Sequence, residues 1–192
     1  MLAKEANIGD LRVRRTRRLL QDKFWELLAE QSFQSITVQD ITARAMVNRA
    51  TFYDHFMDKY ALLQYSIREW FRDTLEKQQP AGGKAENLNG LITTTCEFLA
   101  RLRYHCLPRD HAVLPLVQTT ITDLIAELLY VWQTEPGSAF PADCKLKAAI
   151  SSWAVYGAAY HWSQQEDREP VEQFTRRVLP TIQAGLDRPQ QL

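Results

Sequence analysis

The sequence is poor in cysteine and has no paired cysteine pattern. Cys96, Cys106 and Cys144 are the only cysteines in 192 residues, and they are widely spaced. Domains held together by disulfides usually have many cysteines, even in number, so a reduced cytosolic protein is expected here. A metal site would have to combine His105, Cys106 and His111, with Cys144 as a further candidate, and no pair has the close, repeated spacing of zinc ligands. We therefore expect buried thiols and surface imidazoles, with no metal and no cofactor.

Long apolar runs are also missing. No stretch of 18 apolar residues occurs, and about that many are needed for a helix that spans a bilayer. The first residues, MLAKEANIGDLRVRRTRRLL, lack the apolar core and the small-residue cleavage site of a signal peptide. The expected location is therefore the cytoplasm, with no membrane partner.

Short signatures of enzymes are absent. The sequence contains no G-x-S-x-G, no H-E-x-x-H, no phosphate-binding loop and no dinucleotide fingerprint. Its four histidines, at positions 55, 105, 111 and 161, have no helical spacing that joins them. A catalytic site in a helical domain is an alternative that a turnover assay would detect, and we expect no enzymatic activity.

The chain has no net charge, because 23 Lys and Arg balance 23 Asp and Glu. The distribution is less even, since residues 11–23 carry six cations and one anion, Asp22. The cations of this basic cluster are Arg12, Arg14, Arg15, Arg17, Arg18 and Lys23. Such a cluster can attract nucleic acid, and it can equally be a solvated helix face. Charge alone leaves both interpretations open.

Nearly every segment has the apolar period of a helix, which predicts an all-α fold. Alternation typical of strands and internal repeats are both missing. The expected helices cover about 13–30, a short piece after residue 37, a short piece after residue 48, 58–79, 86–106, 112–133, 142–165 and 169–186. Pro180 lies inside the last of these and should kink it or loosen one turn. The segment QQPAGGK at 78–84 is the one clear boundary.

The two short helices have strong start signals. Thr37 and Asp40 form a capping-box pattern, and Asn48 is a good N-cap for the second short helix. Phe52 and Phe56, four residues apart, give that helix a buried face. Two short helices joined by a tight turn and braced by longer ones indicate a helix-turn-helix. A helix that enters a DNA groove about 12 Å wide gains little from length.

The stretch ITVQDITARAMVNRATFYDHFMDKYALL resembles the signature of the TetR/AcrR family of bacterial transcriptional regulators. The resemblance covers roughly residues 11–63, and the segments SSWAVYGAAYHWSQ and VLPTIQAGL resemble the last two helices of many members more weakly. It implies an N-terminal three-helix DNA-binding domain at 1–60, with the motif at about 36–55. It also implies a larger helical effector-binding and dimerisation domain at 61–192, with helix 58–79 as the connecting lever.

The resemblance also implies DNA contacts, by position. Arg49, Ala50 and Thr51 fall at the start of the recognition helix, and Tyr53 falls on the family's phosphate-contacting tyrosine. The remaining positions expected to face or approach DNA are Thr37, Arg44, His55 and Lys59. Asp54 would repel phosphate, so we expect it to point sideways or to pair within the chain.

The turn departs from the family pattern. Members usually have A-G-V-S or A-G-V-N, whereas this chain has Ala45-Met46-Val47-Asn48. A non-glycine residue in a left-handed backbone costs about 1–2 kcal/mol. We expect either an altered turn or some loss of stability.

The C-terminal part suits a dimer and a ligand pocket. Its helix SSWAVYGAAYHW mixes aromatic residues, which supply area, with small residues, which permit close helix approach. With the last helix it resembles the family's four-helix dimer bundle, and a core helix within one subunit is the alternative. The expected interface residues are Trp153, Ala154, Gly157, Ala158, Phe174, Val178 and Ile182. The expected pocket residues are Ile67, Trp70, Cys96, Leu99, Arg103 and Ile121, with Arg103 suited to an acidic effector.

The expected function is a homodimeric repressor that binds a palindromic operator in double-stranded DNA and is released by an unidentified small molecule. Repression rather than activation rests on the resemblance alone. The alternative is a partner-binding module that kept the fold and lost operator binding, for which Asp54 and Met46 are the support.

Overall fold

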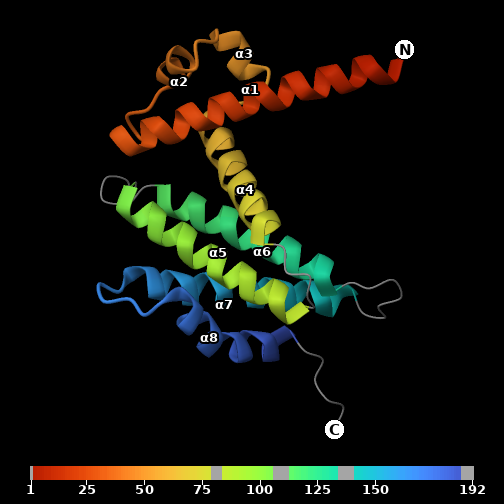
Figure 1. The fold of residues 1–192 in the computed structure, drawn as a ribbon, viewed down its shortest axis with the longest axis vertical. Coiled ribbons are helices and arrows are strands. Elements are labelled where there is room, and N and C mark those ends of the chain that lie inside the picture. The colour runs from red at the N-terminus through yellow and green to blue at the C-terminus, as the bar shows by residue number, and fades with distance from the viewer. Residues whose placement is uncertain (1, 79–83, 106–112, 134–140, 187–192) are drawn as a thin grey trace. The chain divides into compact units, whose positions relative to one another are not determined.

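A computed structural model describes residues 2–78, 84–105, 113–133 and 141–186 (Figure 1). These residues form eight helices, and no strand occurs among them, as the all-α prediction requires. The helices are α1 (Leu2–Glu30), α2 (Val38–Arg44), α3 (Arg49–Tyr53), α4 (Lys59–Gln78), α5 (Lys84–His105), α6 (Leu114–Gln133), α7 (Pro141–Gln164) and α8 (Val171–Leu186). The loop predicted from EPGSAFP and the thiol of Cys106 fall mainly outside the described residues, as does His111.

Helix α1 begins at Leu2, well before the start near residue 13 that the apolar stripe predicted. Leu11 and Val13 are exposed. The added segment contains Ala, Lys, Glu and Arg, which have high intrinsic helix propensity and favour the extension.

The chain divides into two compact units within α4, after Ser66. The first unit holds α1, α2, α3 and the start of α4. The second holds α4 from Ile67 onward with α5 to α8. The domain boundary expected at residue 60 lies a few residues before this division.

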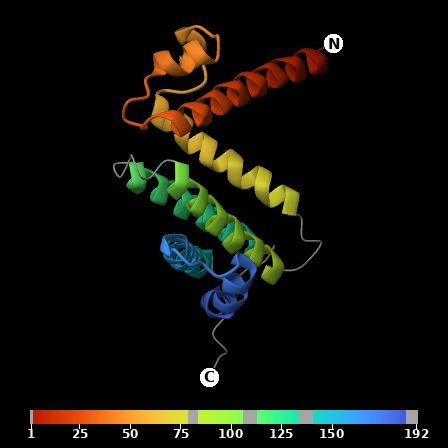
Figure 2. The ribbon, with the colours of Figure 1, turned by 60° about the vertical axis from the view of Figure 1, so that its left-hand side comes forward.

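The core of the first unit joins the two short helices to α1. Both views place α2 and α3 together on one side of α1 (Figure 1, Figure 2). The rings of Phe24 and Phe33 meet edge to face, with centroids 6.1 Å apart, and those of Phe52 and Phe56 lie 5.9 Å apart. Burial of each such side chain contributes roughly 1.5–3 kcal/mol. A helix as short as α3 is unstable alone, so Phe52, which is fully buried, holds it in place.

The turn between α2 and α3 keeps the geometry that usually calls for glycine. Met46 has a φ of 52°, in the left-handed region. Its N–H donates to the Ala43 carbonyl at 3.2 Å, and the Val47 N–H donates to the Thr42 carbonyl at 3.0 Å. This pair of bonds is the Schellman arrangement that closes a helix C-terminus. The standard turn is therefore retained, at the cost of backbone strain.

Met46→Gly is expected to raise the free energy of unfolding by about 0.5–1 kcal/mol, because glycine removes left-handed strain but adds freedom to the unfolded chain. The Met46 side chain is 91% exposed, so little packing is lost. Equilibrium urea unfolding measures the change. Met57→Gly is the matched control, since Met57 is also exposed but has no positive φ, and it should be neutral or destabilising. A loss of stability in Met46→Gly would contradict the strain argument.

The second unit is built around α7, which packs against both α6 and α8. Its buried side chains are mostly apolar, and the buried polar ones are hydroxyls of Ser and Thr. Helix carbonyls satisfy several of these hydroxyls; that of Thr95, for example, donates to the Leu91 carbonyl at 2.7 Å. No charged side chain is buried among the residues that the structure describes. The interior is therefore apolar, with hydroxyls paired along its walls.

Helix α6 is apolar and long enough to cross a membrane by length and composition alone, with a mean hydropathy of 1.3. Its residues Val117, Ile121 and Ile125, spaced by four, are buried. Glu127 on the same helix is bound to Arg68 of α4 at 2.7 Å. This pattern of one buried face and one charged face is typical of a core helix in a globular domain.

Helix α8 continues through Pro180. Proline removes one backbone donor, and here it lies at an exposed position. The carbonyl that loses its partner four residues earlier belongs to Arg176, which is also exposed, so water can satisfy it. The helix is therefore continuous through the position at which a kink or a loosened turn was predicted.

Candidate nucleic-acid interface

The N-terminus of α2 is closed by a complete capping box. The Asp40 N–H donates to Thr37 Oγ1 at 3.1 Å, while the Thr37 N–H and hydroxyl donate to Asp40 Oδ2 at 2.8 Å and 2.6 Å. These hydrogen bonds lower the pKa of Asp40 from its ordinary value, the hydroxyl bond being the largest cause. Thr37 was expected to meet a phosphate, and the structure directs both of its donors to Asp40.

The N-terminus of α3 is closed by Asn48. The Thr51 N–H donates to Asn48 Oδ1 at 2.7 Å, and the Thr51 hydroxyl donates to the same oxygen at 3.0 Å. A cap of this kind contributes about 1 kcal/mol. The Thr51 side chain therefore presents its methyl group and a lone pair, while its proton is engaged.

The outer face of α3 is open. Arg49, Ala50 and Tyr53 are exposed, and Phe52 is buried against the core. Among the described residues, Arg49 forms no hydrogen bond or ion pair, and the Tyr53 hydroxyl has no partner. The edge of the Tyr53 ring meets Phe52, with centroids 5.5 Å apart. One short helix thus presents a guanidinium, a methyl and a phenol on the face that the core does not cover.

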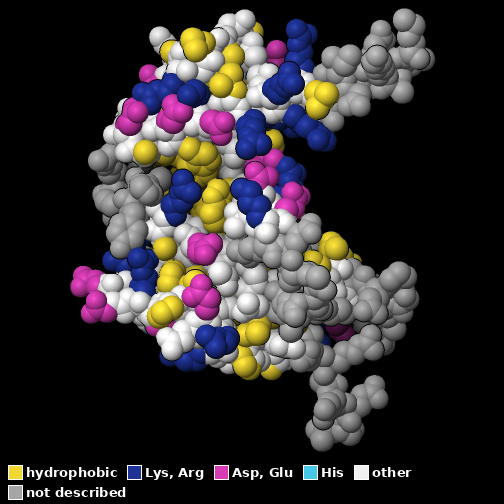
Figure 3. Space-filling view, viewed as in Figure 1, with side chains coloured by type: hydrophobic (Ala, Val, Ile, Leu, Met, Phe, Trp, Pro, Cys, Tyr) yellow, Lys and Arg dark blue, Asp and Glu magenta, His cyan; other side chains and the backbone are white. Residues whose placement is uncertain are grey.

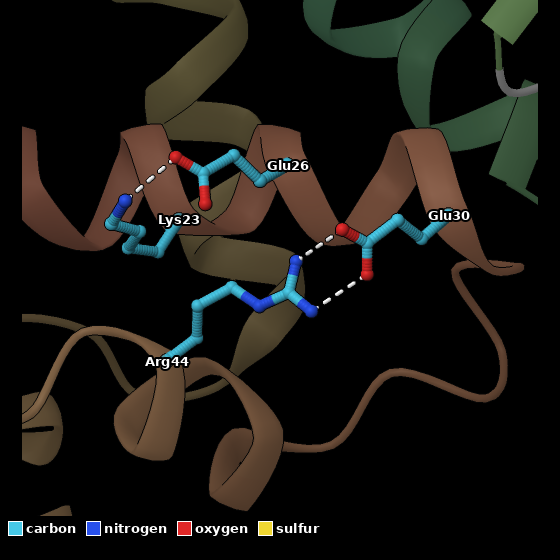
Figure 4. Close-up of polar contacts among 4 residues, drawn as sticks. All are labelled: Lys23, Glu26, Glu30 and Arg44. Carbon is cyan, nitrogen blue, oxygen red and sulfur yellow. Dashed lines mark hydrogen bonds and ion pairs between the residues drawn. The ribbon is translucent and has the colours of Figure 1, made fainter.

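Arg44 is bound to α1 rather than left open. Its two terminal nitrogens each lie 2.6 Å from an oxygen of Glu30 (Figure 4). The hydrogen bond to Arg44 lowers the pKa of Glu30, and the pKa of Arg44 is raised in turn. Nearby, Lys23 is paired with Glu26 at 2.7 Å. A phosphate contact by Arg44, as the sequence suggested, would require this two-pronged pair to open.

Lys59 is engaged by the loop between α1 and α2. Its ammonium donates to the carbonyls of Phe33, Gln34 and Ile36 at 2.8, 3.1 and 2.7 Å. It also lies 4.6 Å from the centre of the Phe33 ring. An ammonium has only three N–H donors, so none remains for the DNA backbone contact expected of Lys59. Sequence inspection missed this role, because the accepting carbonyls lie more than twenty residues earlier in the chain.

His55 and the basic cluster of α1 are only partly open to a partner. His55 is half-buried, and its ring lies 6.5 Å from that of Phe56. Within the basic cluster, the Arg17 guanidinium lies over the Tyr65 ring at 5.6 Å and over Phe56 at 6.0 Å, so it packs inward. On the face drawn in Figure 3, both cationic and anionic side chains lie on the surface of the first unit. The surface is therefore not uniformly basic.

The expected pocket residues lie in the core of the second unit. Ile67, Cys96, Leu99 and Ile121 are buried, and burial raises the pKa of the Cys96 thiol to about 12. The Trp70 ring is half-buried against Phe98, with centroids 5.0 Å apart.

Arg103 has a partner within the subunit. Its guanidinium donates to the Ser163 carbonyl at 2.6 Å, close to the C-terminus of α7. A cation there satisfies a terminal carbonyl and interacts favourably with the helix dipole. The expected role of Arg103 toward an acidic effector stays a prediction. Among the described residues, no three His, Cys, Asp or Glu side chains gather closely enough to hold a metal ion.

The expected dimer residues separate into two groups. On α7, Trp153, Ala154 and Gly157 are exposed, and Ala158 is half-buried. On α8, Phe174 and Ile182 are only 3% and 5% exposed, and Val178 is half-buried. The apolar side of α8 is therefore used within the subunit, because Phe174 packs against Trp162 of α7.

Sequence inspection also missed part of the exposed face of α7. Leu146, Ile150 and Trp153 are 62%, 61% and 55% exposed, and Tyr160 is exposed as well. With Gly157 they follow the spacing of four, three, four and three that lines one face of a helix. The sequence contains this spacing, but the interface prediction used only the aromatic and small residues of the helix and left out Leu146 and Ile150. We call Leu146, Ile150, Trp153, Gly157 and Tyr160 the α7 stripe.

Comparison with known proteins agrees with this geometry. A family model described as bacterial regulatory proteins, tetR family, matches residues 22–65. The uncharacterized HTH-type transcriptional regulator YxbF of Bacillus subtilis (strain 168) is 50% identical over 66 residues, which are 34% of this chain and only 17% of that protein. The HTH-type transcriptional repressor DhaR of Mycobacterium sp. (strain GP1) is 26% identical over 183 residues, covering 86% of this chain and 91% of that protein.

The fold is also similar to that of a solved relative. A TetR transcriptional regulator from Streptococcus agalactiae 2603V superposes with a TM-score of 0.57 at 22% identity, covering 92% of this chain and 98% of that one. The residues matched by the family model contain the capped helices α2 and α3 with their glycine-like turn. The helix-turn-helix therefore lies in the region that matches the family model of the tetR bacterial regulatory proteins, and the helical fold of the chain is similar to that of a solved TetR transcriptional regulator.

Proposed function

We propose that the protein is a homodimeric, sequence-specific DNA-binding regulator of transcription that acts in the cytoplasm. The observation that carries the proposal is α3, a helix held by the buried Phe52 with Arg49, Ala50 and Tyr53 open on its outer face. A helix so presented can place its first turns against base edges in the major groove. The names of the related proteins, as regulators and a repressor, support the same function.

The contact set that we propose is narrower than the sequence suggested. Arg49 reaches guanine or phosphate, Ala50 and the methyl of Thr51 meet thymine methyls, and Tyr53 with His55 approaches the phosphates. Arg44, Lys59 and the side chain of Thr37 instead hold α2 and its loop in position, because their donors are engaged within the chain. The backbone amides at the start of α2 stay available to a phosphate.

The proposed dimer forms through the α7 stripe. A row of large apolar side chains exposed on one helix is the kind of surface that a partner covers. Gly157 supports this, because a Cβ added there would meet no atom within 4 Å among the described residues, apart from its own chain neighbours and helix backbone. Glycine inside a helix costs about 1 kcal/mol relative to alanine. Since no contact within the subunit requires it, we assign it to close approach of a second copy of α7.

Dimerisation and regulation follow from this arrangement. Two α3 helices related by a twofold axis read a palindrome with half-sites about one DNA turn apart. We propose that a small molecule held among Ile67, Trp70, Cys96, Leu99 and Ile121 releases the operator, with α4 as the lever. These walls favour an apolar ligand, and it must bind the two states of the protein unequally to have an effect.

Selection from a pool of random duplexes, at two salt concentrations, tests the function. The wild type should enrich a palindrome, and affinity should fall as salt rises. Arg49→Ala should weaken binding about 5- to 150-fold, since one bidentate guanine contact is worth about 1–3 kcal/mol. Arg176→Ala, which removes an exposed arginine from α8, is the matched control and should bind as the wild type. Folded, dimeric protein that enriches no motif would favour the partner-binding alternative.

A further inference from the structure

Asp54 occupies an unusual place for an acidic residue in a DNA-binding motif. Its backbone N–H donates to the Ala50 carbonyl at 2.9 Å, so it extends α3 by one helical position. Its side chain is exposed and forms no hydrogen bond or ion pair within the part of the chain that the structure describes. Of the two alternatives that the sequence suggested, pairing within the chain is therefore not found among the described residues.

Helical geometry places the Asp54 side chain on the outward line of α3. Residues in a helix are about 100° apart, so Ala50 and Asp54 both point roughly opposite to Phe52, the residue buried in the core. Arg49 lies to one side of that line and Thr51 to the other. If the outer face of α3 enters a groove, Ala50 and the Asp54 carboxylate enter it first.

Among the described residues, no cation is paired with this carboxylate. Arg49 is five residues earlier, about 140° away around the helix. The Lys59 ammonium is surrounded by three loop carbonyls, and Arg44 is bound to both oxygens of Glu30. The Asp54 carboxylate is therefore open to a donor from a bound partner.

The major groove offers few donors to an acceptor-only group. An ionised carboxylate can only accept hydrogen bonds, and phosphates repel it. The exocyclic amino groups of cytosine and adenine are the donors in this groove, and adenine places its N7 acceptor beside that amino group. Cytosine N4 presents no such neighbouring acceptor on the same base, so it suits a carboxylate better.

We infer that Asp54 is a specificity-determining residue that accepts a hydrogen bond from the N4 amino group of a cytosine in each operator half-site. This assignment rests on the proposed DNA-binding function. The Asp54 carboxylate then adds little affinity for DNA in general, because phosphates repel it. It contributes to sequence specificity, because it selects one base at one position.

The test is the same selection, run with wild type, Asp54→Ala and Asp54→Asn, followed by titration of the selected operator. The wild type should require cytosine at one fixed position of each half-site, with about a tenfold loss when that base pair is exchanged. In Asp54→Ala the exchange should matter less than about twofold, and in Asp54→Asn, whose amide both accepts and donates, adenine should be tolerated at that position. Binding of both variants to DNA of unrelated sequence should stay equal or become tighter. Asp167→Ala, which removes an exposed acid from the second unit, should leave the base preference unchanged.

The outcomes separate this inference from the function on which it rests. Variants that keep the cytosine requirement would overturn the role of Asp54 while leaving the regulator intact. A wild type that selects a palindrome without that cytosine would do the same. Failure of the wild type to select any motif would overturn both. Thermal unfolding of each variant confirms that a lost preference does not come from a lost fold, since only the backbone of Asp54 is used within α3.

Discussion

Gly157→Leu is expected to run as a monomer at protein concentrations at which the wild type is a dimer. A Cβ added at this position meets no atom within 4 Å among the described residues, apart from its own chain neighbours and helix backbone. In a twofold interface the change occurs twice at one crossing point. Overpacking a close contact costs about 1–3 kcal/mol for each copy, so the dimer should dissociate roughly 100-fold more readily or worse. Sedimentation at a series of concentrations measures the dissociation constant.

Two further variants make that experiment decisive. Ala29→Leu enlarges an exposed small residue on α1, outside the α7 stripe, and should leave the dimer unchanged. Ile150→Glu places a charge within the α7 stripe and should dissociate the dimer as Gly157→Leu does. Thermal unfolding should show that the Gly157→Leu subunit is folded, because leucine is a better helix former than glycine. A dimer of unaltered affinity in both α7 variants would show that the subunits associate through another surface.

Lys59→Met is expected to lower the free energy of unfolding by about 3 kcal/mol. Methionine has a similar length but no donor, so three loop carbonyls lose their charged partner. Hydrogen bonds to charged groups are worth about 1.5–3 kcal/mol each, and water replaces part of this because the loop is partly exposed. The contact of the ammonium with the Phe33 ring is also lost. Equilibrium denaturation of the full chain measures the change.

Lys23→Met is the matched control for Lys59. Lys23 makes one pair with Glu26 on the surface of α1, and such pairs are worth little, about 0–1 kcal/mol. If Lys59 were instead a phosphate contact, its replacement would leave stability unchanged and would reduce the salt dependence of DNA binding. The two readouts therefore distinguish a loop clamp from a DNA contact. Both effects are measured on the same purified variants.

Local patterns predicted the local features of the site well. Thr37 with Asp40 and Asn48 with Thr51 are caps in which both partners lie within one helical turn. The apolar period likewise indicated Phe52 and Phe56 as core residues, and both are buried. Met46 shows a limit of local reasoning. A non-glycine residue suggested an altered turn, and the turn nevertheless keeps its left-handed conformation.

The partners of Arg44 and Lys59 could not be predicted from local sequence patterns. Arg44 and Lys59 both looked free for phosphate, since positive charge beside a recognition helix has that use. Their partners are Glu30 and the carbonyls that follow α1, which come close only when α1, α2 and α4 fold together. Arg103 is a similar case, because the carbonyl of Ser163 that it meets is sixty residues away.

Sequence alone determined the class of this protein: an all-helical chain with a capped, two-helix motif and a tight turn between its helices. Those features depend on neighbours within a few residues, so periodicity and capping chemistry reveal them. Tertiary structure alone decided which polar groups remain open to a partner and which apolar faces remain uncovered. It engaged Arg44 and Lys59, buried Phe174 and Ile182, and left Asp54 and the α7 stripe exposed. The physical reason is that a hydrogen-bond donor engaged by one acceptor, or an apolar face covered by one neighbour, is no longer open to another. Only the folded chain shows which neighbour that is.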